Sequence, residues 1–514
     1  GAEFGVRGYI TAYDAETGKQ DWRFFTVPGD PKEMPKGKGM EIAAKTWFGD
    51  NYHKQGGGGT VWDSMSYDPE LNLLYIGVGN GSSWNPRIRS EGKGDNLFLS
   101  SIVAINPDNG EYVWHYQTTP GDAWDYTATQ HIMLVDLELD GKQRKVLMQA
   151  PKNGFFYVID RATGKLISAR NIVPVNWASG IDVKSGRPIE NPAARYPGGK
   201  AAIVYPSPFG AHNIEAMSFN PGSGLVYIPT MDQGRVYIDP AEPLKSWKHL
   251  DGQRISVGTG APPPGVTPDR PATSFLLAWN PVTQSEAWRI PMPGLRGGGG
   301  TATTAGNLLF QGNAGGKFVA YAATSGKPLW SFDAQTAVMA QPISYRARGR
   351  QYVTVIAGSR FPSAIGLPRE WNYRIQQWRV LTFALDGKAA LPKVDPVDMP
   401  VIDDPAFAVD PARAAIGATV FGQRCSICHG ANAVSGGAAP DLLQSGVPLD
   451  TASMKDVLHN GILRERGMPR FQELTDDEIA GLQHYFRQRA RQVLAAQSAG
   501  QPGAQTHRGL NEGQ

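Results

Sequence analysis

Ala12-Tyr-Asp-Ala-Glu-Thr-Gly18-Lys-Gln-Asp-Trp22 is the stretch of sequence that decides the fold, because the chain repeats it. Copies lie at residues 104–114, 278–288 and 320–330, and weaker copies begin at residues 158 and 218. A copy is typical of a β-hairpin with glycine at the turn, and most copies end in tryptophan four residues later. A single hairpin cannot bury its aromatic face, so stacked copies predict the blades of a β-propeller. The tryptophans expected between neighbouring blades are Trp22, Trp114, Trp288 and Trp330.

The composition supports an all-β class for this region. The 514 residues include 61 Gly, 39 Pro and 13 Trp, and only 19% are charged, which is typical of a turn-rich and aromatic-rich protein. The net charge of +3 is too small to indicate binding of nucleic acid. No apolar run reaches the ~18 residues that a membrane span requires. We therefore expect an all-β propeller over residues 1–390, long enough for about five to six blades.

A second motif, Cys425-Ser-Ile-Cys428-His429, contains both cysteines of the chain. Its spacing matches the attachment site of c-type haem, in which two thiolates bond to the haem and the adjacent histidine ligates the iron. The alternatives are a redox dithiol, half of a zinc site and chance. A zinc site needs a second set of ligands, and a thioredoxin-like dithiol needs no histidine at this position. The motif predicts an electron-carrying domain. Because such haem is usually attached outside the cytoplasm, it also predicts a periplasmic location.

The sixth iron ligand is expected downstream of this motif. Met468 lies in a stiff Gly-Met-Pro turn, where its thioether would raise the haem potential. Met454 is the second candidate, but it falls in a helix expected over residues 451–463. A methionine is by default a core residue, so packing is the ordinary interpretation of Met468. Pro440 resembles the proline of cytochrome c folds whose carbonyl holds the ligating imidazole.

Helices are expected around this haem motif. One covers residues 412–423, and Thr475-Asp-Asp-Glu478 is a capping box that opens another. Gly417, in the first helix, would let the two helices cross closely. The expected divisions after the propeller are a Pro- and Asp-rich linker (391–410), a small all-α cytochrome c domain (411–497) and a disordered tail (498–514).

Five further segments are distinctive. They are residues 1–9 (GAEFGVRGY), 56–64 (GGGGTVWDS), 77–81 (GVGNG), 120–126 (PGDAWDY) and 150–156 (APKNGFF). Together with the tryptophan repeat and the haem motif, they resemble the quinohaemoprotein alcohol dehydrogenases over nearly the whole chain. The resemblance implies an eight-bladed propeller that holds pyrroloquinoline quinone (PQQ) and Ca²⁺ in its central channel. This chain would match it only from a point inside the propeller, and the adjacent cysteines that cover PQQ would lie upstream.

The resemblance also implies roles for particular residues. Ca²⁺ prefers oxygen ligands, and Glu3, Asn80 and Asp125 are the implied protein ligands. Asp125 would also take the alcohol proton as general base, and Lys152 would bind the quinone oxygens. Trp62 would stack against the PQQ plane. The other implied PQQ contacts are Thr60, Asn213 and the backbone of Gly1 and Ala2.

Each of these residues also has an ordinary interpretation. Asp125 fits a turn, Lys152 fits a solvated loop and Trp62 fits a wedge between blades. Two departures from the family leave the substrate open. Ile214 stands where relatives often have tryptophan, and the loop at Arg360 lacks the Gly-Trp pattern expected near the cofactor.

The implied function is oxidation of an alcohol to an aldehyde or ketone with PQQ and Ca²⁺, and transfer of single electrons to the chain's own haem c. The expected partners are a small alcohol and an external electron acceptor, which is a cytochrome, a copper protein or a quinone-linked subunit. A second hypothesis is the large catalytic subunit of a membrane-associated alcohol dehydrogenase. A third, from another class, is a propeller scaffold fused to an electron-carrying cytochrome. A scaffold has no need for a calcium shell beside a stacked tryptophan, which counts against that hypothesis.

Overall fold

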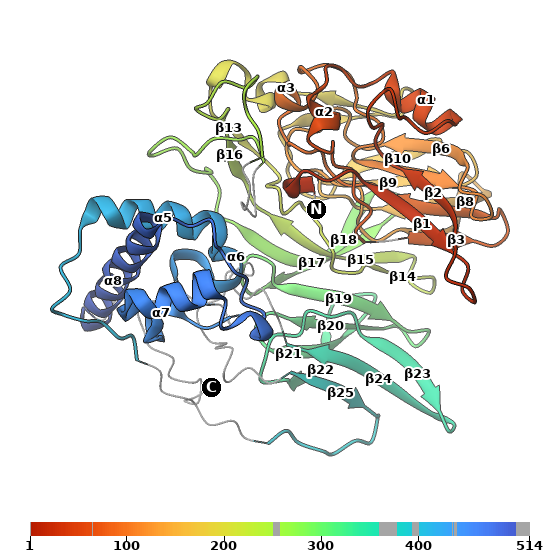
Figure 1. The fold of residues 1–514 in the computed structure, drawn as a ribbon. Coiled ribbons are helices and arrows are strands. Elements are labelled where there is room, and N and C mark those ends of the chain that lie inside the picture. Colours follow the sequence, from red (N-terminus) through yellow and green to blue (C-terminus); the bar gives the residue numbers. More distant parts are fainter. Residues whose placement is uncertain are drawn as a thin grey trace.

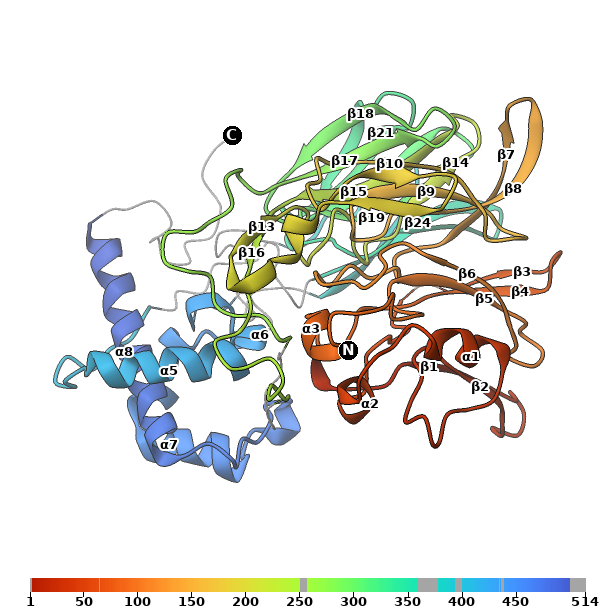
Figure 2. The same cartoon turned by 90° about the horizontal axis from the view of Figure 1, so that it is seen from above.

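The structure is a computed structural model that describes residues 2–63, 65–249, 257–358, 378–392, 400–433, 435 and 439–499. Strands occupy most of the first part of the chain, and the longest helices gather near its C-terminal end. In two perpendicular views these helices lie together to one side of the sheets (Figure 1, Figure 2). The all-β propeller and the small helical domain expected from the sequence are both present.

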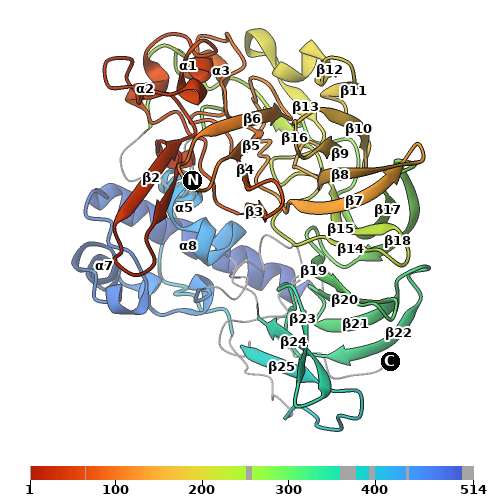
Figure 3. The same cartoon turned by 90° about the vertical axis from the view of Figure 1, so that its right-hand side faces the viewer.

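Six antiparallel sheets form the blades in the described part of the chain, and they follow one another in chain order as a fan (Figure 3). The blades are β1–β2 (Tyr9–Tyr13, Gln20–Phe25), β3–β6 (Met65–Asp68, Leu73–Gly77, Ser101–Ile105, Tyr112–Gln117), β7–β10 (Met133–Leu139, Lys142–Gln149, Phe155–Asp160, Leu166–Asn171), β14–β15–β17–β18 (Ser218–Asn220, Leu225–Asp232, Thr273–Asn280, Ser285–Met292), β19–β22 (Gly298–Thr303, Leu308–Asn313, Lys317–Ala322, Pro328–Asp333) and β23–β25 (Ile343–Ala347, Arg350–Ala357, Arg379–Phe383).

Four of these blades have four strands, whereas the first has two and the last has three. The number of blades agrees with the five to six expected from the repeat. Two small sheets lie outside the blades: β11–β12 (Ala178–Asp182, Arg187–Glu190) and β13–β16 (Ala202–Val204, Arg235–Tyr237). Among the described residues, no strand pairing joins the first blade to the last.

The repeated tryptophan of one blade packs on the turn glycine of the next blade. A Cβ atom added to Gly110 would lie 2.6 Å from the Trp22 ring, and one added to Gly164 would lie 2.5 Å from the Trp114 ring. Gly326 meets Trp288 in the same way. Glycine is therefore required at these turns for two reasons, since each has a positive φ and each is covered by an indole ring. The predicted position between blades is confirmed for these three tryptophans, of which Trp114 is buried and Trp22 and Trp288 are partly buried.

Trp330 departs from this pattern, and the prediction that it is buried was wrong. Its ring contacts Phe383 of β25 with a centroid distance of 5.2 Å, yet 41% of the residue is exposed. The three described strands of the sheet β23–β25 leave part of the indole uncovered.

A second departure from the repeat affects both sides of one interface between blades. Ser168 occupies the tryptophan position of blade β7–β10, and Gln284 occupies the glycine position of the blade that follows it. Gln284 has a φ of 54°, and its amide Nε2 donates to Ser168 Oγ at 2.9 Å. The glutamine side chain thus fills space that an indole fills at the other interfaces.

The helices of the N-terminal part lie in loops, and those of the C-terminal part make the cytochrome core. The helices are α1 (Lys38–Ala44), α2 (Asn51–Lys54), α3 (Pro86–Arg89), α5 (Pro411–Arg424), α6 (Ser426–His429), α7 (Thr451–Lys455) and α8 (Asp476–Ser498), with a π-helical turn at Asp456–Asn460. Short 3-10 turns are Ala2–Phe4, Pro192–Arg195, Pro197–Gly199, Ala431–Ala433, Leu442–Gln444, Val447–Leu449 and Arg464–Arg466.

Helices α5 and α8 cross at a pair of glycines. A Cβ atom on Gly417 would lie 2.0 Å from the carbonyl oxygen of Gly481, so the predicted close crossing is confirmed. Thr475 and Glu478 form the predicted capping box at the start of α8. The helix expected over residues 451–463 is shorter, because α7 passes into the π-helical turn, which ends at Gly461 with a φ of 70°. Among the described residues, none of the helices has the length and apolarity that crossing a membrane would take.

Candidate active site and haem site

Two of the three predicted metal ligands are in direct contact. Glu3 lies in the first 3-10 turn, and Asn80 lies in the loop that follows β4. The Asn80 amide donates to Glu3 Oε1 at 3.2 Å, and the indole N–H of Trp84 points to the same oxygen at 3.4 Å. The chain therefore fixes the Glu3 carboxylate through two side chains of one loop.

Asp125, the third predicted ligand, lies in the loop between β6 and β7 and pairs with Lys152. Lys152 Nζ and Asp125 Oδ2 are 2.8 Å apart, and the two side chains are only 8% and 10% exposed. Burial raises the pKa of Asp125 to about 8, which the Lys152 ammonium opposes and the charge of Glu3 reinforces. The Glu3 carboxylate is thus close enough to act on Asp125. A divalent cation near both would relieve the repulsion between them.

The Asp125 loop has several hydrogen bonds that hold its backbone. Asp122 Oδ1 accepts the backbone N–H groups of Trp124 and Tyr126 at 3.1 and 3.0 Å, on either side of Asp125. The Tyr237 hydroxyl donates to the Trp124 carbonyl at 2.9 Å. Asp125 itself has a φ of 69°, which non-glycine residues rarely adopt. The loop therefore holds the catalytic candidate in an uncommon conformation.

The predicted PQQ contacts differ in their exposure and hydrogen bonding, and not all of them are described by the structure. Trp62 is 39% exposed, so part of this residue is accessible. The Thr60 hydroxyl is buried without a hydrogen-bond partner among the described residues. Asn213 is buried, but its amide donates to Phe209 O at 2.8 Å. Gly1 lies outside the described residues, and of Ala2 only the backbone is described.

These observations fit a planar polar cofactor and a cation. The Thr60 hydroxyl can both donate and accept a hydrogen bond, and Trp62 is a partly exposed aromatic residue of the kind that stacks on a planar ligand. In the described residues there is no cluster of three or more His, Cys, Asp or Glu side chains arranged for a metal ion. The protein share of the site is two carboxylates and an amide, so a hard cation here would need further oxygen ligands from the cofactor.

Other residues near the site did not emerge from the sequence. Glu215 is buried and pairs with Arg296 at 2.6 Å, and burial, with a smaller contribution from the charge of Glu215, raises the pKa of Asp63 to about 6. Trp84 and Arg89, which support the metal-ligand loops, were also missed. Two features of the sequence could have pointed to these residues. Asp63 is adjacent to Trp62, and Glu215 lies shortly after the Gly-Ala-His-Asn segment.

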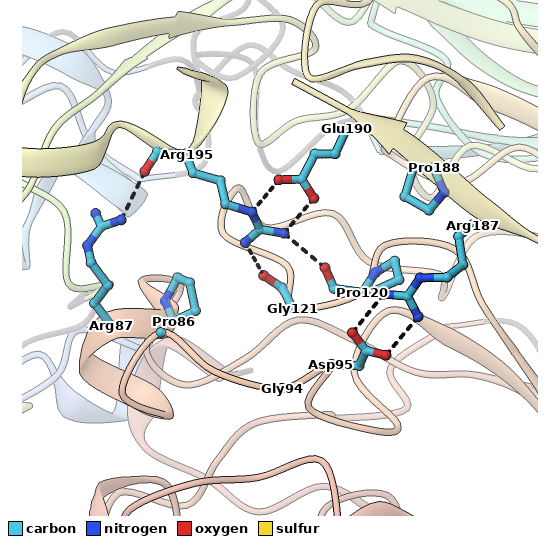
Figure 4. Close-up of a pocket in the computed structure, with 11 residues that line it drawn as sticks. Pro86, Arg87, Gly94, Asp95, Pro120, Gly121, Arg187, Pro188, Glu190 and Arg195 are labelled. Atoms are coloured by element: carbon cyan, nitrogen blue, oxygen red, sulfur yellow. Dashed lines mark hydrogen bonds and ion pairs between the residues drawn. The ribbon is translucent and has the colours of Figure 1, made fainter. Parts of the chain in front are cut away.

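A cavity of about 340 Å³ is lined in part by Pro120 and Gly121, which precede Asp125 in the same loop (Figure 4). Four of its charged groups form two pairs, Arg187 with Asp95 at 2.8 Å and Arg195 with Glu190 at 2.7 Å, and a fifth, Arg87, pairs with Asp239. The Arg195 guanidinium also donates to the carbonyl oxygen of Gly121 at 2.7 Å. The contact between Arg195 and Gly121 stabilises the segment that leads to Asp125. Both ion pairs neutralise charge at the cavity wall.

The haem motif occupies the end of α5 and the whole of α6. Cys425 is the C-cap of α5, and Cys428 and His429 follow within α6. His429 Nδ1 and the carbonyl oxygen of Pro440 are 2.8 Å apart, which is the contact predicted for the imidazole. This hydrogen bond would fix the ring with Nε2 as the nitrogen that ligates iron.

The two candidate methionines differ in their surroundings. Met454 is 3% exposed, within α7 and inside the apolar core of the helices. Met468 is partly buried at the edge of the same core, in an irregular segment that follows Gly467 with a φ of 88°. Met454 is therefore placed as a core residue, and Met468 is placed in a turn at the margin of the core.

Two family models match the chain. The model described as "Glucose/ethanol/alcohol dehydrogenase, beta-propeller domain" matches residues 2–181 and 185–353. The model described as "Cytochrome C oxidase, cbb3-type, subunit III" matches residues 412–486. The two matches fall on the sheets and on the C-terminal helices, respectively.

Individual relatives match nearly the whole chain. Quinohemoprotein alcohol dehydrogenase ADH-IIG of Pseudomonas putida is 52% identical over 507 residues, which are 96% of this chain and 69% of that protein. The quinohemoprotein alcohol dehydrogenase of Comamonas testosteroni is 44% identical, over 95% of this chain and 68% of that protein. The solved structure of the Pseudomonas putida HK5 enzyme ADHIIG superposes with a TM-score of 0.89 at 50% identity, covering 96% of this chain and 73% of that one. These matches, together with the pair of Asp125 and Lys152 and the haem motif, show that the chain belongs to the quinohaemoprotein alcohol dehydrogenases.

Proposed function

We propose that this chain oxidises alcohols with PQQ and Ca²⁺ and passes the electrons through its own haem c to an external acceptor. The observation that carries the proposal is the buried pair of Asp125 and Lys152, set close to the contact between Glu3 and Asn80. A buried carboxylate that lies near a second carboxylate and also pairs with an ammonium is expensive to maintain for structure alone. Perturbed groups of this kind are typical of catalytic sites.

The roles of the protein groups follow from their chemistry. When bound, PQQ supplies the two-electron acceptor and Ca²⁺ polarises its carbonyl. Glu3, Asn80 and Asp125 hold the cation through oxygen, and Asp125 accepts the hydroxyl proton of the alcohol. Lys152 Nζ donates to the quinone oxygens and stabilises negative charge there. Trp62 provides the stacking face, and Thr60, Asn213 and the backbone of Gly1 and Ala2 contact the polar rim of PQQ.

The haem part takes the electrons one at a time. Cys425 and Cys428 would hold the haem through thioether bonds, and His429 and Met468 would ligate its iron. The proposed divisions of the chain are the propeller (1–390), linker (391–410), cytochrome domain (411–497) and tail (498–514), and most of the linker's first half and nearly all of the tail lie outside the described residues. The proposed location is periplasmic, because c-type haem is usually attached outside the cytoplasm.

The subunit hypothesis is the second candidate. It is favoured by the alcohol dehydrogenase (quinone), dehydrogenase subunit, of Gluconobacter oxydans, which is 44% identical over 96% of this chain and 67% of that protein. The acceptor would then be a quinone-linked partner subunit. A cytochrome or a copper protein would be the acceptor of the independent enzyme. Family membership removes the scaffold hypothesis, since the relatives with these identities are dehydrogenases.

Alcohol-dependent reduction of the haem tests the proposed function. We expect that holoenzyme mixed with a primary alcohol shows reduction of the haem absorption bands. Protein stripped with a chelator and freed of PQQ should not react, and PQQ with Ca²⁺ should restore the reaction where PQQ alone does not. Stopped-flow absorbance measures the rates. Haem reduction by alcohol in the absence of PQQ would end the quinoprotein proposal.

Met468→Ala tests the axial ligand. The variant should keep its haem under denaturing electrophoresis, because the thioether bonds remain. It should lose the weak long-wavelength absorption band that methionine ligation gives to ferric haem. Met454→Ala is the matched control. It should keep the band while losing roughly 2–5 kcal/mol of stability as a core truncation. An unchanged band in Met468→Ala would remove that residue from the role and point to Met454.

A further inference from the structure

Arg89 is a fully buried arginine whose five N–H groups are all used. Its Nη1 donates to the carbonyl oxygens of Ser83 and Trp84 at 2.6 and 2.9 Å. Its Nη2 donates to the carbonyl oxygen of Asp122 at 2.8 Å and to Asn96 Oδ1 at 2.9 Å, and its Nε donates to the same Asn96 oxygen at 3.1 Å. Arginine has five donors in a planar fork, so this guanidinium is saturated by protein acceptors.

One arm of the guanidinium holds the loop that positions Glu3. Ser83 and Trp84 follow Asn80 in the loop after β4, and the Trp84 indole and the Asn80 amide both point to Glu3 Oε1. The carbonyl of Trp84 is fixed by Arg89 while its side chain contacts Glu3. A shift of Arg89 would therefore move a group that touches a proposed metal ligand.

The other arm holds the loop that positions Asp125. Arg89 binds the carbonyl of Asp122, whose carboxylate accepts the N–H groups of Trp124 and Tyr126. These two residues flank Asp125, which is held at a φ of 69°. A left-handed conformation is unfavourable for an ordinary residue, so it persists only where its neighbours fix it.

We propose that Arg89 is a positioning residue for the cation site, which sets the separation between the loop that holds Glu3 and Asn80 and the loop that holds Asp125. This inference rests on the proposed function, since it concerns the cation that those residues would bind. The planar fork matters more than the charge, because three main-chain carbonyls and one amide oxygen are reached in different directions. Lysine keeps the charge, but it has three donors on one nitrogen and cannot reach all four oxygens.

Gly81 provides independent evidence that the space around the guanidinium is fitted to it. A Cβ atom on Gly81 would lie 2.4 Å from Arg89 Nη1, and its three nearest atoms all belong to the Arg89 side chain. Gly81 does not have a positive φ, so alanine is conformationally allowed there. Gly81→Ala would push the guanidinium and leave all of its acceptors in place.

Ca²⁺ affinity of the chelator-treated protein tests the inference, by titration calorimetry in the presence of PQQ. Arg89→Lys should weaken Ca²⁺ binding by about 10–100-fold, the usual effect of removing a group that orients a metal ligand. Gly81→Ala should weaken it in the same direction by several-fold. Arg161→Lys is the matched control, because Arg161 is likewise a buried arginine, with 8% of its side chain exposed, and pairs with Asp68 and Asp136 at 2.7 and 2.9 Å. This control should keep wild-type Ca²⁺ affinity.

Turnover provides a second measurement. At saturating Ca²⁺, Arg89→Lys should recover a large part of its turnover number, because the cation pulls the two loops into place. Wild-type affinity in Gly81→Ala and Arg89→Lys would overturn the inference, and so would an equal loss in Arg161→Lys. If Arg89→Lys does not fold, Gly81→Ala decides alone. Wild-type protein that binds no Ca²⁺ would instead overturn the proposed function, and the role of Arg89 with it.

Discussion

Asp125→Asn should lower turnover of the holoenzyme by at least about 100-fold, the lower end of what a positioned general base contributes. Asparagine has nearly the same shape as aspartate and keeps an oxygen for the cation, so PQQ and Ca²⁺ should remain bound. It has no basic carboxylate to accept the alcohol proton, and the rate of the chemical step therefore falls. The rate of alcohol-dependent haem reduction and the cofactor content of the purified variant are the two measurements.

A control for this variant is Asp232→Asn, in the strand β15. Asp232 is also partly buried and paired with an arginine, with 3.2 Å between Arg270 Nη2 and Asp232 Oδ1, and burial likewise raises its pKa. Its turnover should stay within about threefold of wild type, since nothing places it near the cofactor. Near-wild-type haem reduction by Asp125→Asn would transfer the base to another carboxylate. Asp122 is the nearest in sequence, although one of its oxygens already holds the loop.

Gly417→Ala should destabilise the cytochrome helices by about 1–2 kcal/mol. The added methyl group would lie 2.0 Å from the main-chain oxygen of Gly481, so α5 and α8 must move apart. Overpacking of this kind typically costs 1–3 kcal/mol, and the better helix propensity of alanine offsets at most about 1 kcal/mol. Denaturant unfolding followed by the haem Soret band measures the change.

Gly422→Ala separates this packing effect from helix propensity. Gly422 lies in the same helix, α5, but a Cβ atom there would have no neighbour within 4 Å. This variant should be neutral or more stable by up to about 1 kcal/mol. Equal destabilisation by the two substitutions would contradict the crossing described for Gly417 and Gly481.

The parts that sequence predicted well are those set by local spacing. A hairpin is contained in about ten residues, so the repeat around Gly18 and Trp22 was sufficient to predict blades. The haem motif and the capping box at Thr475 are likewise short. The contact between His429 and Pro440 joins residues eleven positions apart, and resemblance to cytochrome c folds predicted it.

The parts that sequence did not predict depend on contacts between distant segments. Nothing near Trp330 in the sequence shows how little of its indole the following blade covers. Arg89 donates to the main-chain oxygen of Asp122, 33 positions away in the sequence. Every residue has such an oxygen, so the identity of the bound residue gives no sign of the contact. The pairing of Asp125 with Lys152 spans 27 positions and was expected only through the resemblance to a family.

The contact between Gln284 and Ser168 has a consequence for recombining blades. Three interfaces between blades have the same contact, an indole on one blade and a turn glycine on the next. The interface between Ser168 and Gln284 has a hydrogen bond between two polar side chains instead. Blade β7–β10 presents serine to its successor, and the successor presents glutamine to it. A chimera that transplants either blade alone would set glutamine against an indole or serine against a bare turn. The two blades therefore form one unit of exchange, and a library of shuffled blades should carry them together.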